Sequence, residues 1–107
     1  MFKTNEYFEG KVKSIALEDL KGNATIGAMA PGEYEFGTVD REYMTTITGA
    51  MIVKLPGCDE WKTFGKFETF IVEPNMKFQV KVEDTTSYLC RYEKVKEGGC
   101  GCGCGCS

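Results

Sequence analysis

Histidine is absent from the 107-residue sequence, and so are long apolar runs. Without histidine, the chain cannot form a metal site that depends on imidazole ligands. No apolar run approaches the roughly 20 residues that a membrane-spanning helix needs. The first residues, MFKTNEYF, are charged where a secretory signal would carry an apolar segment, so we expect a cytoplasmic protein without membrane contact.

Basic residues are also few. Lysine and arginine number 13 against 16 aspartates and glutamates, which gives a formal net charge of −3 and a pI of about 5.0. A general nucleic-acid-binding surface would be basic, so the composition argues against that class of partner. The chain has only two arginines, Arg41 and Arg91, and no glycine-rich phosphate loop.

Short segments of alternating apolar and polar residues predict an all-β fold. The clearest lies over residues 77–83, where Phe78, Val80 and Val82 share one face. Further strands are expected at about 11–17, at 33–36, over 43–55 with a turn at Gly49, at 66–72 and at 85–92. Hydrophobic residues make up 42% of the chain, enough for one modest core, so we predict a single domain over residues 1–93.

A glycine- and cysteine-rich tail follows over residues 94–107 and ends in GGCGCGCGCS. This composition cannot pack a core, so we predict a flexible segment. Its thiols suit zinc or copper(I), and both metal binding and a simple appendage fit the pattern. The thiols are Cys100, Cys102, Cys104 and Cys106. In the body of the chain, Cys58 and Cys90 are predicted to be reduced, because no secretion signal is evident.

The segment PGEYEFGTVDREYMTTITG, residues 31–49, resembles the first motif of the cupins, which are small double-sheet barrels related to jelly rolls. Glu42 falls at the position of the motif's glutamate, whereas the motif's metal-binding histidines have no counterpart. The resemblance implies an all-β, single cupin-type (jelly-roll-like) β-barrel. It also implies that the barrel holds no histidine-based metal site.

Four segments extend the likeness from Asn5 to Tyr92: NEYFEGKVKSI, PGEYEF, MTTITG and TSYLCRY. Together they resemble the small pyrimidine/purine nucleoside phosphorylase family of single-domain cupins. The resemblance implies a homodimeric pentosyltransferase that converts a purine or pyrimidine nucleoside and inorganic phosphate to free base and ribose 1-phosphate. It implies no cofactor, no metal in the barrel and no nucleic-acid partner.

Cleavage of an N-glycosidic bond passes through an oxocarbenium-like state, so an oriented phosphate and a donor to the leaving base are expected. We predict Arg91 as the phosphate ligand, pointing inward near the barrel mouth, because an arginine fork matches phosphate geometry. Glu42, as a ligand of the ribose hydroxyls, and Tyr88 are the other catalytic candidates. The candidate substrate-binding residues are Tyr34, Thr38, Tyr43 and Ser87. Because Arg91 and Tyr88 lie on opposite faces of a regular strand, both can face the interior only if a bulge intervenes.

Purely structural interpretations remain open for the charged candidates. Arg41 or Arg91 can form a surface ion pair, Arg91 can make a dimer contact, and Glu42 can be a solvated carboxylate at a loop end. Two alternatives to the enzyme also remain: a non-enzymatic cupin module that binds a small sugar or nucleotide, and a thiol-metal protein carried on the barrel. Phosphate-dependent release of base would separate the first from the enzyme, and activity of a chain ending after Tyr92 would separate the second.

Overall fold

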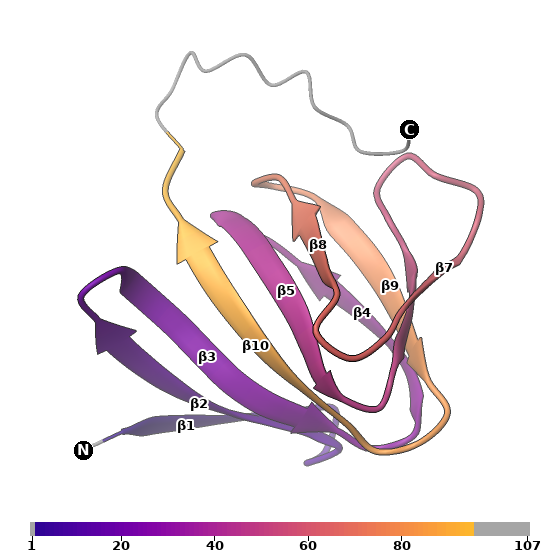
Figure 1. The fold of residues 1–107 in the computed structure, drawn as a ribbon, viewed down its shortest axis with the longest axis horizontal. Coiled ribbons are helices and arrows are strands. Elements are labelled where there is room, and N and C mark those ends of the chain that lie inside the picture. The colour runs from indigo at the N-terminus through magenta and orange to yellow at the C-terminus, as the bar shows by residue number, and fades with distance from the viewer. Residues whose placement is uncertain (1, 96–107) are drawn as a thin grey trace.

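The computed structural model describes residues 2–95, which form ten β-strands and no helix (Figure 1). The strands are β1 (Lys3–Tyr7), β2 (Val12–Asp19), β3 (Gly22–Met29), β4 (Gly32–Gly37), β5 (Arg41–Thr48), β6 (Met51–Lys54), β7 (Lys62–Phe64), β8 (Thr69–Val72), β9 (Lys77–Val82) and β10 (Thr86–Glu93). The prediction of an all-β fold is confirmed. The described residues accordingly include no helix that is long and apolar enough to cross a membrane. The tail thiols, Cys100, Cys102, Cys104 and Cys106, lie outside the described residues, so the predicted flexible tail and its metal ligands stay predictions.

The strands make two antiparallel sheets. The larger has six strands in the order β1-β2-β3-β10-β5-β8, and the smaller has four in the order β4-β9-β6-β7. Figure 1 shows the larger sheet spreading from β1 at the left to β8, with β4 and β9 behind it. From β3 onward the chain changes sheets at every connection except β6–β7. The strand pairing within residues 2–95 leaves the two sheets separate, so the fold is a jelly-roll-like sandwich and not a fully hydrogen-bonded barrel.

The core lies between the two sheets. In β9 the buried Phe78, Val80 and Val82 alternate with polar residues, as the sequence predicted. The ring of Phe78 lies 5.8 Å, centroid to centroid, from Phe70 on β8 of the other sheet. Full burial of a side chain of this size contributes about 1.5–3 kcal/mol, so such contacts across the sandwich are the main source of its stability.

The turn predicted at Gly49 is confirmed, and it is a corner between sheets. It joins β5 in the six-stranded sheet to β6 in the four-stranded sheet. Gly49 has a φ of 80°, and an added Cβ would lie 2.5 Å from Thr86 Oγ1. Only glycine meets both conditions without strain, and Thr86 then donates a hydrogen bond of 3.2 Å to the carbonyl of Ala50.

Candidate active site

A cavity of about 300 Å³ lies between the two sheets. This volume is at the lower end of the range for small-molecule sites. The six-stranded sheet provides most of its polar wall, and β4 and β9 of the smaller sheet provide an aromatic wall. Its lining residues are Tyr7, Phe8, Ser14, Thr25, Glu35, Phe36, Gly37, Glu42, Met44, Phe78, Tyr88, Cys90 and Tyr92.

Glu42 is the half-buried acid of this cavity. It lies on β5 between Tyr92 of β10 and Val72 of β8, so its backbone is fixed on both sides. The pKa of the Glu42 carboxyl is raised to about 7. Burial is the main cause, a hydrogen bond from Cys90 opposes the shift, and the charge of Asp40 adds to it. The Cys90 thiol donates that bond to Oε1 over 3.5 Å. At neutral pH the carboxyl is therefore divided between its two protonation states, which suits proton transfer.

Cys90 is a buried, free thiol beside this acid. Burial raises the pKa of Cys90, and the charge of Glu42 raises it further. The thiol is therefore a hydrogen-bond donor at neutral pH and not a thiolate nucleophile. The prediction of a reduced cysteine is confirmed for Cys90.

Two tyrosines on β10 supply neutral hydroxyls to the cavity. Burial raises the pKa of Tyr88 to about 12, and the neighbouring Cys90 adds to the shift. Burial likewise raises the pKa of Tyr92, whose hydroxyl lies 3.0 Å from Thr25 Oγ1. The ring of Tyr88 lies against Gly27, where an added Cβ would come within 2.6 Å of its hydroxyl oxygen. Both hydroxyls stay protonated at neutral pH and can donate to a bound ligand.

The charged residues that line the described cavity are both acidic, Glu35 and Glu42. None of the lysines or arginines among residues 2–95 belongs to its lining. Nor does any group of three metal-ligand side chains occur in this part of the chain. The hydrogen-bond donors that the cavity can present to a bound anion are therefore hydroxyls, a thiol, backbone N–H groups and the protonated form of Glu42.

The amino-acid sequence matches the family described as pyrimidine/purine nucleoside phosphorylase over residues 2–92. The chain belongs to that family. A pyrimidine/purine nucleoside phosphorylase from Pseudomonas putida strain W619 is 59% identical over 92 residues, which cover 86% of this chain and 98% of the relative. One from Pseudomonas paraeruginosa is 58% identical, with 86% of this chain and 99% of the relative covered. The family predicted from the sequence is therefore confirmed.

Solved structures share the fold of this family member. A protein of unknown function from Vibrio parahaemolyticus is 43% identical, with a TM-score of 0.84 over 87% of this chain and 99% of that one. A cupin from Shewanella frigidimarina has a TM-score of 0.67 at 15% identity, over 91% of this chain and 87% of that one. At that identity the likeness shows the fold alone. The predicted cupin-type, jelly-roll-like fold is confirmed.

The structure corrects the predicted direction of the Arg91 side chain. The prediction that Arg91 points inward is wrong, because it alternates with the cavity-lining Cys90 and Tyr92 along β10 and so lies on the outer face. Its guanidinium donates hydrogen bonds of 3.1 and 2.7 Å to the two carboxylate oxygens of Asp19. A register shift does occur between Ser87 and Tyr88, but residues 88–92 alternate regularly after it.

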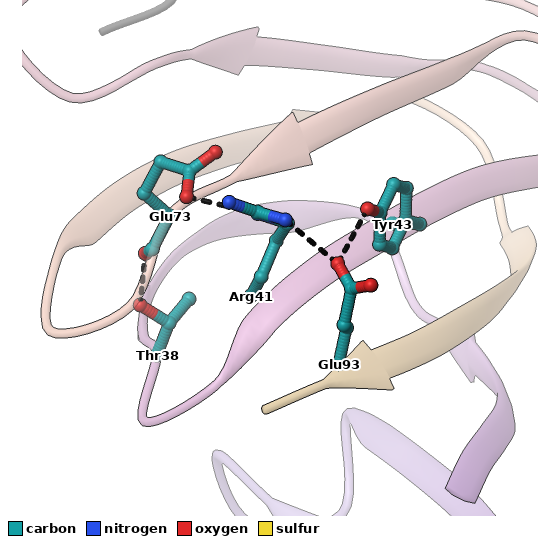
Figure 2. Close-up of polar contacts among 5 residues, drawn as sticks. All are labelled: Thr38, Arg41, Tyr43, Glu73 and Glu93. Carbon is teal, nitrogen blue, oxygen red and sulfur yellow. Dashed lines mark hydrogen bonds and ion pairs between the residues drawn. The ribbon is translucent and has the colours of Figure 1, made fainter. Parts of the chain in front are cut away.

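Arg41 lies in a second cluster of charges, at the start of β5. Figure 2 shows its guanidinium between two carboxylates: Nε lies 2.9 Å from Glu73 Oε1, and Nη1 lies 2.7 Å from Glu93 Oε1. Tyr43 also donates to Glu93, over 2.7 Å, and Thr38 donates to the backbone carbonyl of Glu73 over the same distance. Arg41 thus forms ion pairs, as its structural interpretation predicted. The cluster ties β5 to the end of β10 and to the loop after β8.

Of the predicted site residues, the cavity contains Glu42 and Tyr88. Thr38 and Tyr43 belong to the Arg41 cluster, Tyr34 donates to the carbonyl of Ala30 over 2.6 Å, and Ser87 lies 2.7 Å from Thr48 Oγ1. The sequence reasoning missed Cys90 and Tyr92 as lining residues, although both share the strand face of Tyr88. It also missed Tyr7 and Phe8, which reach the cavity from the turn between β1 and β2.

Proposed function

We propose that this chain is a nucleoside phosphorylase that converts a purine or pyrimidine nucleoside and phosphate to free base and ribose 1-phosphate, without a metal in its cavity. One observation carries the proposal: Glu42, whose pKa burial raises to about 7, lies in a cavity lined by aromatic rings and neutral hydroxyls. Such a site suits a flat base, a polyhydroxylated sugar and a proton transfer between them.

The reaction breaks the C1′–N bond, and the base departs with the bonding electron pair. In the proposed mechanism the protonated Glu42 donates its proton to the departing base as general acid. The sugar passes through an oxocarbenium-like state, and an oxygen of dihydrogen phosphate forms the new bond to C1′. Phosphate then returns one proton to Glu42, so the acid is restored and the products are the neutral base and ribose 1-phosphate.

The tyrosine hydroxyls hold the two substrates in this proposal. Tyr88 and Tyr92 stay protonated and can donate to phosphate or ribose oxygens, and Thr25 is already paired with Tyr92 at the wall. A neutral Glu42 avoids repulsion between its carboxylate and phosphate. Arg91, Tyr34, Thr38, Tyr43 and Ser87 lie outside the cavity lining, so we assign them structural support of the site.

The deciding experiment incubates uridine and inosine with the protein, with and without phosphate, and measures free base and ribose 1-phosphate. We expect base release that depends on phosphate and matches the ribose 1-phosphate formed. Glu42→Gln is the inactive control, and Glu33→Gln, which removes an exposed acid of β4 outside the lining, is the matched active control. Base release that is independent of phosphate would overturn phosphorolysis.

A non-enzymatic cupin that binds a nucleoside or sugar is the second candidate. It is favoured by the acidic lining of the described cavity, which has no lysine or arginine to hold phosphate. This candidate predicts saturable nucleoside binding by calorimetry and no base release at any phosphate concentration. The same incubation therefore separates the two functions.

We also propose that the chain is a homodimer, as the family resemblance implied. A row of apolar side chains crosses the outer face of the six-stranded sheet, with Ile15, Ile26 and Leu89 directly opposite one another on β2, β3 and β10. An exposed apolar row of this kind is typical of an interface between copies. The cytoplasmic location expected from the sequence stays a prediction.

A further inference from the structure

The turn between β1 and β2 places two aromatic residues at the cavity. Tyr7 ends β1 and Phe8 begins the turn, and both line the cavity that contains Glu42. Phe8 and Glu9 have φ angles of 54° and 59°, a region that bulky residues rarely occupy. Backbone hydrogen bonds of 3.2 Å from Gly10 to Tyr7 and from Lys11 to Phe8 hold the turn in this form. The backbone thus keeps Phe8 in a position that a relaxed turn would not give it.

The ring of Phe8 reaches the opposite sheet but is not covered there. Its centroid lies 4.9 Å from that of Tyr34 and 5.6 Å from that of Phe36, both on β4. Even so, 42% of Phe8 is exposed. An aromatic ring that is fixed on one side and open on the other, at the wall of a cavity, is a surface suited to stacking.

The stacking surface is part of the same compact site as the proposed acid. Tyr7, Tyr88 and Glu42 all line the one cavity of about 300 Å³, so the turn and the acid share a single small site. Phe36, which contacts Phe8, is followed by Gly37 and then by the loop over residues 38–40 that leads into β5 and Glu42. A nucleoside in the cavity can therefore meet the aromatic turn and the acid together.

We infer that Phe8, packed against Tyr34 and Phe36, is the platform on which the nucleobase stacks. The inference rests on the proposed function and specifies how the base is selected. Every base has an aromatic face, so stacking binds purines and pyrimidines without reading their hydrogen-bonding edges. A platform of this kind would accept any flat base by its shape and so give a broad substrate range. Glu42 would carry out the proton transfer.

The test compares Phe8→Ala, Phe8→Leu and Phe8→Tyr with the wild-type chain. Calorimetry in phosphate-free buffer measures the Kd of inosine and uridine. We expect Phe8→Ala to raise the Kd by about 5- to 150-fold, more for inosine because its base has the larger face. Phe8→Leu should behave like Phe8→Ala, and Phe8→Tyr should stay within about twofold of wild type because it keeps a ring. KM should rise with Kd while kcat changes less.

Phe67→Ala is the matched control. Phe67 is also an exposed phenylalanine with a positive φ, at 67% exposure and 66°, but it does not line the cavity. Its removal should leave nucleoside affinity unchanged. Far-UV spectra establish whether each variant is folded. If Phe8→Ala does not fold, Phe8→Leu takes its place in the comparison.

Three outcomes overturn the platform. They are unchanged affinity in a folded Phe8→Ala or Phe8→Leu, an equal loss in Phe8→Tyr, and no nucleoside binding by the wild-type chain. By contrast, wild-type binding that weakens in Phe8→Ala, without phosphate-dependent release of base, would uphold the platform and overturn the proposed enzyme.

Discussion

Arg91 and Asp19 are 72 positions apart in the sequence, yet their side chains form a two-pronged ion pair on the outer face of the six-stranded sheet. The hydrogen bonds from Arg91 lower the pKa of Asp19 to about 2, and a backbone hydrogen bond from Lys21 adds to the shift. The pair joins the end of β2 to β10 across β3. The guanidinium fork is therefore occupied by a carboxylate of its own chain.

The first prediction concerns Arg91→Ala. Because the side chain lies outside the cavity lining, we expect turnover and the KM for phosphate to stay within about twofold of wild type. Asp19→Asn, which removes the partner, is the matched variant and should behave alike. A hundredfold loss with a shifted phosphate dependence, on the order expected for a lost transition-state ligand, would instead restore Arg91 as the phosphate ligand.

The second prediction concerns the catalytic role of Glu42. Glu42→Gln should lower kcat by about 10²–10⁴-fold, the usual contribution of a general acid, with intact folding. Wild-type activity should fall as the pH rises above about 7, because the pKa of the Glu42 carboxyl is about 7 and its proton is lost there. The residual activity of Glu42→Gln should lack this dependence. An unchanged pH profile in the variant would assign the titration to another group.

The third prediction concerns stability against pH. The pKa of Glu42 is about 7 in the folded chain against an ordinary value of 4.5. Between these values the unfolded chain releases a proton that the folded chain keeps, so the contribution of Glu42 to stability is fully present below about pH 4.5 and is lost as the pH rises through about 7. The loss is at most about 3 kcal/mol, reduced by solvent at the half-buried carboxyl.

Denaturant unfolding of wild type and Glu42→Gln from about pH 4 to pH 8 measures this effect. Wild-type stability should fall relative to that of the variant as the pH rises. Parallel curves would mean that the Glu42 carboxyl is solvated in the folded chain.

The fourth prediction concerns metals and the tail. A chain that lacks residues 98–107 should keep its fold and its phosphorolysis, because the family match ends at residue 92 and the cavity lies within the described residues. Chelator treatment of that shortened chain should not change its rate. A rate that falls by more than about tenfold on chelation, equivalent to about 1.4 kcal/mol of barrier, and returns with added metal would contradict the metal-free reaction.

The fifth prediction concerns the outer apolar row. Ile26→Lys places a charge at its centre, between Ile15 and Leu89, and should convert a dimer into a monomer by light scattering. Leu20→Lys is the matched control, because Leu20 is fully exposed in the turn between β2 and β3. Wild type that is already monomeric at micromolar concentration would refute the dimer.

Local patterns were sufficient to predict most strands. The alternation in β9 and the shared face of Tyr88, Cys90 and Tyr92 in β10 follow directly from the two-residue period of a strand. The direction of Arg91 follows from the same rule, and it was mispredicted because a functional role was given priority over strand parity. The contribution of Phe8 could not be predicted, because it depends on how a turn at one end of the chain packs against β4.

The contact between Gly27 and Tyr88 limits how the cavity can change in evolution. A Cβ at position 27 would lie 2.6 Å from the Tyr88 hydroxyl and 2.7 Å from the backbone carbonyl of Lys13. Both the Tyr88 ring and the backbone of the neighbouring strand lie in the way of a side chain, so even alanine would displace Tyr88 from its place in the cavity wall. The size of the cavity can therefore change through the aromatic turn or β4, while position 27 stays closed to substitution.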